Sequence, residues 1–175
     1  MTPEGTRLAG WWHRALAAIL DGTVLFVVAT ALLSPIYLTI SERMRPVVDQ
    51  MFREALRGEA ITPLRPEQLM SQQEQVIILI VTVGLALVYH VGLLRWRGQT
   101  LGKMISGLRV VPADDHATHH LGWRAAIMRS IMWVVPGQHT CLWPIRVVDV
   151  FLPLSNPQRQ ALHDRVAGTQ VIRSR

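Results

Sequence analysis

The sequence has a single cysteine and no signature of a catalytic nucleophile. Because Cys141 is alone in 175 residues, an internal disulfide is excluded and the redox compartment is not indicated. Ser106, Ser130 and Cys141 all lack surroundings such as the G-x-S-x-G turn. We therefore expect no enzymatic activity. The sequence also lacks low-complexity tracts and long linkers.

Acidic residues are fewer than basic ones. The 18 Lys and Arg residues against 12 Asp and Glu give a formal net charge of +6. A basic stripe on a soluble fold would indicate nucleic-acid binding. Here the arginines flank hydrophobic runs instead, as cytoplasmic anchoring charges do in membrane proteins. We expect no nucleic-acid partner.

Long hydrophobic runs are plentiful, since half of the residues are hydrophobic. A bilayer core needs about 20 predominantly apolar residues. Residues 15–37 and 76–94 meet this length, so we predict two full transmembrane helices with the lipid bilayer as partner. The alternative for the first run is a signal peptide cleaved near Ala29-Thr30-Ala31. Asp21 in the middle of that run argues against cleavage, as does the second run.

The loop charges predict the orientation. Residues 95–109 carry no acid but contain four basic residues: Arg95, Arg97, Lys103 and Arg109. By the positive-inside rule this segment faces the cytoplasm, and so does the N-terminal arm, residues 1–13. Residues 38–74 carry both signs of charge and would form the extracytoplasmic loop, with an amphipathic helix over 38–56. Pro35 is expected to bend or end the first transmembrane helix.

The third hydrophobic region, 123–154, is interrupted by Pro136-Gly137 and by charged residues. Its pieces, 123–135 and 140–154, are shorter than a normal span, which is typical of broken or re-entrant helices. The tail, 155–175, is basic and is therefore expected in the cytoplasm. A hairpin or a re-entrant pair would return it there, whereas a single full span would put it outside, and we prefer the return.

Two segments share a helix–glycine–strand pattern. Gly107 precedes the strand-like residues 108–111, and Gly168 precedes 169–172. We predict that the two strands pair and that, being only two, they lean on the membrane helices. Asn156 is the expected N-cap of the tail helix.

The predicted fold is therefore a single domain, 1–175. It is an all-α integral membrane protein with two full transmembrane helices, a broken or re-entrant third helical region, and a small cytoplasmic two-stranded β element.

Two polar motifs have plain structural explanations. The 98–103 block resembles a phosphate loop only superficially, because its glycines are four apart and Met104 replaces Ser or Thr. The second motif contains potential metal ligands, but a polar surface turn is the preferred interpretation. Its members are Asp114, Asp115, His116, His119 and His120. We expect no metal and no cofactor.

His90, inside the second run, would either relay protons or make a structural hydrogen bond.

Arg14 and Asp21 place charge in or beside the first apolar run. A charge at the centre of an inserted helix costs roughly 2.5–3.5 kcal/mol, so such residues usually pair or line a pathway. Their spacing of seven residues puts both on one face of a helix. We predict that they converge with a carboxylate of the tail.

Three blocks carry a family resemblance: WWHRALAAILD, GQTLGKMISGLRVV at 98–111, and LHDRVAGTQVI at 162–172. Together they resemble the RDD family of bacterial membrane proteins, named for one arginine and two aspartates. By this resemblance the motif residues are Arg14, Asp21 and Asp164, with Asp149 as the alternative second aspartate. Accessory polar residues would be His90, Asp149 and Lys103. The resemblance implies a multi-pass protein of the bacterial inner membrane, and the loop charges predict that both termini are cytoplasmic.

The resemblance leaves two functions open. A small transporter or ion/proton exchanger would use the Arg/Asp network to bind and release its ligand, which the sequence does not identify. A non-transporting scaffold or assembly module would use the same charges for structure. A transporter this small would need to be a homo-oligomer, for which Ala18-x-x-x-Gly22 offers a packing surface.

Overall fold

The computed structural model describes residues 7–61, 63, 65, 69–118, 120–138 and 140–174. It divides into two compact units, one formed by Met1–Phe26 with Val83–Arg175 and the other by Val27–Thr82. We call them the first and second units. The described residues are mostly helical, with one small sheet.

Two helices in the described part of the chain are long and apolar enough to cross a membrane. They are α1 (Trp11–Arg57) and α3 (Gln72–Arg97). Each contains one of the predicted spans, which confirms two long apolar helices. The helices are longer than the spans: α1 has 47 residues and α3 has 26.

Pro35 does not end the first helix, because α1 continues past it to Arg57. Proline cannot donate to the carbonyl four residues before it, here that of Ala31. The Ser34 hydroxyl donates to this carbonyl instead, at 2.8 Å. The freed acceptor is therefore satisfied, as transmembrane helices allow. The helix predicted over 38–56 is therefore present, but it is a continuation of α1 rather than a separate helix.

The second unit contains a bidentate ion pair between α1 and α3. Arg43 donates to both carboxylate oxygens of Glu74 at 2.8 and 2.9 Å. Glu74 also accepts from Ser71, whose hydroxyl in turn accepts from the Glu74 amide at 3.2 Å. This reciprocal capping box begins α3.

The third hydrophobic region is broken, as predicted. It consists of α5 (Trp123–Val134), the short 3₁₀ turns η1 (Val135–Gly137) and η2 (Thr140–Leu142), and α6 (Trp143–Ser155). The two α-helices have 12 and 13 residues, too few for a full span.

The predicted strand pairing is confirmed in the first unit. Strand β1 (Leu108–Pro112) pairs antiparallel with β2 (Thr169–Arg173), with Val110 opposite Val171. Gly107 and Gly168 precede the strands with φ of 64° and 61°. This left-handed conformation favours glycine and ends the short helices α4 (Leu101–Ile105) and α7 (Leu162–Val166).

The tail helix begins later than expected. Asn156 does not start it; its side-chain amide donates to the Leu152 carbonyl at 2.9 Å and to the Gln160 carbonyl at 2.7 Å. Its side-chain oxygen also accepts from the Gln160 amide. Asn156 therefore closes α6 and the turn after it, and α7 starts only at Leu162.

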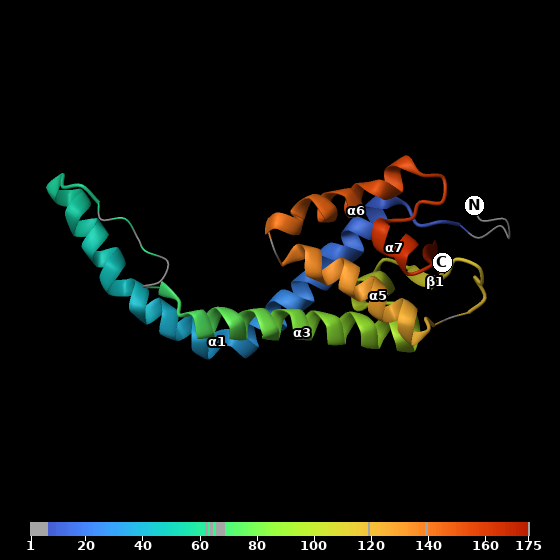
Figure 1. The fold of residues 1–175 in the computed structure, drawn as a ribbon, viewed down its shortest axis with the longest axis horizontal. Coiled ribbons are helices and arrows are strands. Elements are labelled where there is room, and N and C mark those ends of the chain that lie inside the picture. The colour runs from blue at the N-terminus through green and yellow to red at the C-terminus, as the bar shows by residue number, and fades with distance from the viewer. Residues whose placement is uncertain are drawn as a thin grey trace. The chain divides into compact units, whose positions relative to one another are not determined.

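The N-terminal arm also binds the sheet, which the sequence did not indicate. Leu8 bridges to Ile172, and the Ala9 amide donates to the Val171 carbonyl at 3.0 Å. The sheet leans on the helices, as predicted, because both strands contribute to one buried apolar cluster. Its members are Ala9, Ala17, Leu94, Leu108, Val110, Leu121, Ala126 and Val171. In Figure 1 this first unit is the part that gathers α5, α6, α7 and β1.

Candidate functional site: a buried charge network and its pocket

Asp164 is the most deeply buried charge of the first unit, with none of its surface exposed. Its carboxylate accepts from Arg14 Nη1 at 2.6 Å, from Arg129 Nη1, and from the Ala161 amide at 3.0 Å. Burial alone would raise its pKa, but the charges of Arg129 and Arg14 outweigh burial and hold the pKa well below its usual range. Asp164 is therefore ionised at any physiological pH.

Local structure explains how these side chains meet. Asp164 lies in the first turn of α7, where its carboxylate accepts from the free backbone amide of Ala161. Arg14 comes from the first turn of α1 and Arg129 from the middle of α5. Arg129 also donates to Thr169 Oγ1 at 2.6 Å, which ties α5 to the start of β2.

A second carboxylate, Asp149 on α6, is 2% exposed and pairs with His163. Nδ1 of His163 lies 2.7 Å from Asp149 Oδ2, and the His163 amide donates to Oδ1 at 2.9 Å. Burial and the Arg129 charge lower the pKa of His163. The ring is thus neutral at pH 7, with its Nδ1 proton donated to Asp149.

Asp21 has a separate set of partners. Its carboxylate accepts from Tyr89 Oη at 2.6 Å, Thr100 Oγ1 at 2.5 Å and the Gly102 amide at 2.7 Å. Lys103 Nζ lies 3.7 Å from it. Burial lowers the pKa of Lys103 to about 8, although the Asp21 charge opposes that shift.

Gly102 permits this approach of α4 to α1. A Cβ at this position would collide with the backbone oxygen of Ala17 and lie 2.9 Å from the carboxylate of Asp21. The 98–103 block, which superficially resembles a phosphate loop, therefore offers its amide to a carboxylate of the same chain.

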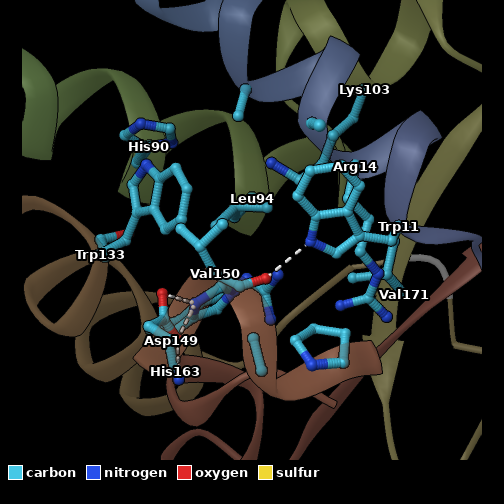
Figure 2. Close-up of a pocket in the computed structure, with 16 residues that line it drawn as sticks. Trp11, Arg14, His90, Leu94, Lys103, Trp133, Asp149, Val150, His163 and Val171 are labelled. Atoms are coloured by element: carbon cyan, nitrogen blue, oxygen red, sulfur yellow. Dashed lines mark hydrogen bonds and ion pairs between the residues drawn. The ribbon is translucent and has the colours of Figure 1, made fainter. Parts of the chain in front are cut away.

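A cavity of about 110 Å³ lies within the first unit, beside these groups. Figure 2 shows Trp11 reaching across it to the Val150 carbonyl, a hydrogen bond of 2.8 Å, and His163 against Asp149. Its polar lining includes Arg14, His90, Lys103, Arg129, Ser130, Asp149 and His163. Its apolar lining includes Ala15, Ala18, Leu94, Val150 and Val171.

The predicted convergence of three charges is met only in part. Arg14 and Asp164 form an ion pair, which favours Asp164 over Asp149 as the partner of Arg14. Asp21 instead binds α3 and α4. The accessory residues His90, Lys103 and Asp149 line the cavity. Arg129 was not predicted to belong to the charge network. In the sequence it is a single arginine within an apolar run, which does not identify its partner.

The His-rich turn is engaged locally. His116 Nε2 lies 2.9 Å from Gln170 Oε1, and Asp115 accepts from the amides of Ala117 and Thr118. His119 lies outside the described residues. Within the described part of the chain, no three His, Cys, Asp or Glu side chains are grouped to hold a metal ion.

Comparison with known proteins agrees with the sequence blocks. The family model described as the RDD family matches residues 8–168. The chain is 26% identical over 165 residues to "Uncharacterized membrane protein YteJ" of Bacillus subtilis (strain 168), an alignment that covers 94% of this chain and 80% of that protein. No solved structure matches the chain significantly. With the family model matching nearly its whole length, the chain belongs to the RDD family.

Proposed function

We propose that the protein is a non-enzymatic membrane module in which the RDD charges hold the sheet and short helices of the first unit against its two apolar helices. The observation that carries this is the full engagement of the motif carboxylates. Asp164 accepts from two arginines and an amide, and Asp21 accepts from three donors. Removing one partner from a buried charge pair is strongly destabilising, so carboxylates with this many partners suit a structural role.

The same proposal assigns the N-terminal arm, the sheet and the tail of the first unit to the cytoplasmic side of a bacterial inner membrane. Its support is the acid-free basic run of residues 95–109 and the basic tail. The N-terminal arm, β1 and β2 are joined by hydrogen bonds, so these three segments must share one side. The 38–74 segment would then be extracytoplasmic.

The experiment is conservative removal of one motif charge. Asp21→Asn keeps the shape but removes the charge and one of the acceptor oxygens, so a structural carboxylate predicts a lower melting temperature. Ion and proton flux would be measured in liposomes containing the purified wild-type protein and the variant. We expect a lower melting temperature and no protein-dependent flux in either. Flux that depends on Asp21 would reject the structural role.

The second candidate is a small ion/proton exchanger, favoured by the Lys103–Asp21 pair. Lys103 lines the cavity and has a pKa of about 8, so it would change charge near physiological pH. With two long apolar helices the chain would have to work as a homo-oligomer. Wild-type flux that persists in Arg43→Ala but disappears in Asp21→Asn would favour this candidate.

A further inference from the structure

The guanidinium of Arg14 is only partly used. Its Nη1 donates to Asp164, while Nε and Nη2 are buried and have no hydrogen-bond partner among the described residues. An arginine carries five N–H donors, and a buried donor without a partner is unfavourable because it has lost its hydrogen bonds to water. Nε and Nη2 form one edge of the guanidinium, the edge that binds both oxygens of a carboxylate or phosphate side by side.

The cations that line the cavity are balanced by carboxylates of the first unit, since Arg14 and Arg129 pair with Asp164 and Lys103 lies 3.7 Å from Asp21. Three of its lining residues are cationic, namely Arg14, Lys103 and Arg129, and one is a carboxylate, Asp149. That carboxylate is already held by His163. A ligand with negative charge would meet the Nε and Nη2 donors of Arg14, for which the described residues supply no acceptor.

The remaining lining sets the size and polarity of the ligand. Alanines, Leu94, Val150 and Val171 make most of the wall apolar. A cavity of about 150 Å³ holds a benzene ring in other proteins, so about 110 Å³ suits an oxyanion with only a few carbons.

We propose that this cavity is a binding site for an oxyanion group, a carboxylate or phosphate carrying a short apolar substituent, held by the free edge of Arg14 and by Lys103. The group is either a free small acid or the head of a membrane lipid. The site does not depend on the structural role proposed for the RDD charges, because Arg14 binds Asp164 through Nη1 and would bind the ligand through Nε and Nη2.

The test is a calorimetric titration of the full-length protein in non-ionic detergent at constant ionic strength. The probes are inorganic phosphate, butyrate and dihexanoyl phosphatidylglycerol. Binding of phosphate or butyrate alone identifies a free acid, and binding of the lipid alone identifies a headgroup. No saturable binding of any probe would overturn the proposal.

Two variants locate the binding. Ala18→Leu fills the cavity without altering charge, and Lys103→Gln removes one cation while keeping Arg14 on Asp164. Each should weaken binding at least tenfold, whereas Arg53→Gln, a cation of the second unit, should leave it unchanged. Melting temperatures without ligand identify any variant that fails to fold, in which case the other variant decides. Wild-type affinity in a folded Ala18→Leu protein would place the ligand elsewhere and overturn the proposal.

Discussion

At the residue scale, Asp164 balances more buried charge than any other single group of the first unit. Two guanidinium groups, from α1 and α5, converge on its carboxylate, and the α7 backbone supplies a third donor. Removing one partner of a buried ion pair leaves the other charge without compensation, which costs far more than the intact pair contributes. Here a single neutralisation would leave two arginines uncompensated.

We therefore expect Asp164→Asn to lower the free energy of unfolding by roughly 3–5 kcal/mol. Thermal unfolding of the purified protein in detergent would measure the loss. Asp49→Asn, an exposed carboxylate on α1, is the matched control and should change little. Similar melting temperatures for the two variants would contradict a stabilising role for Asp164.

Lys103 should make the free energy of unfolding increase as the pH rises above 8. Its pKa is about 8 in the folded protein against an ordinary value of 10.5. Between these values the unfolded chain holds a proton that the folded protein lacks, so the free energy of unfolding rises with pH. Between pH 8 and pH 10.5 the free energy of unfolding should rise by about 3 kcal/mol.

Denaturant unfolding at pH 7.5, 9 and 10.5 would measure this dependence. Lys103→Met removes the titrating group and should flatten the rise relative to the wild type. An identical pH profile in the variant would show that another group is responsible.

At the element scale, α4 lies directly against α1 at Gly102. The Gly102 amide binds Asp21, and the absence of a Cβ lets the backbone lie against Ala17. The short α4 helix has five residues, too few to be stable by itself, so docking on α1 holds it.

Gly102→Ala should therefore destabilise the protein by about 1–3 kcal/mol through overpacking against backbone that cannot move aside. Gly92→Ala is the control, because a Cβ there meets nothing within 4 Å and alanine favours the helix. We expect a lower melting temperature for the first variant and an equal or higher one for the second. The reverse order would contradict the close packing of α4 on α1.

At the scale of the whole molecule, the N-terminal arm, the segment after α3 and the tail are linked by backbone hydrogen bonds. The Arg173 amide donates to the Arg7 carbonyl at 2.9 Å, and β1 pairs with β2. The three segments therefore lie on the same side of any membrane that α1 and α3 cross. Basic residues in 95–109 predict that this side is the cytoplasm.

Cysteine labelling of intact cells tests this arrangement. In a Cys141→Ser background, cysteines at Thr118 and Ser174 should react with a membrane-impermeant maleimide only after permeabilisation. A cysteine at Ser41 should react from outside. Labelling at Ser174 from outside would contradict the cytoplasmic tail, and different behaviour of Thr118 and Ser174 would contradict the shared side.

Short-range features were readable from the sequence by itself. Long apolar runs predicted α1 and α3, because membrane insertion depends on the hydrophobicity of consecutive residues. Gly107 and Gly168 predicted where short helices end and strands begin, because left-handed backbone is a local property of glycine. The broken third region likewise followed from residues adjacent in the chain.

Partner choice was decided only by the tertiary structure. Arg14 and Asp164 are 150 residues apart in the chain. Arg129 also binds Asp164, although in the sequence it only interrupts an apolar run. Asp21 shares a helical face with Arg14 in sequence, yet it binds the Gly102 amide on α4. The strength of a charge pair depends on distance and burial in three dimensions, neither of which the order of residues along the chain specifies.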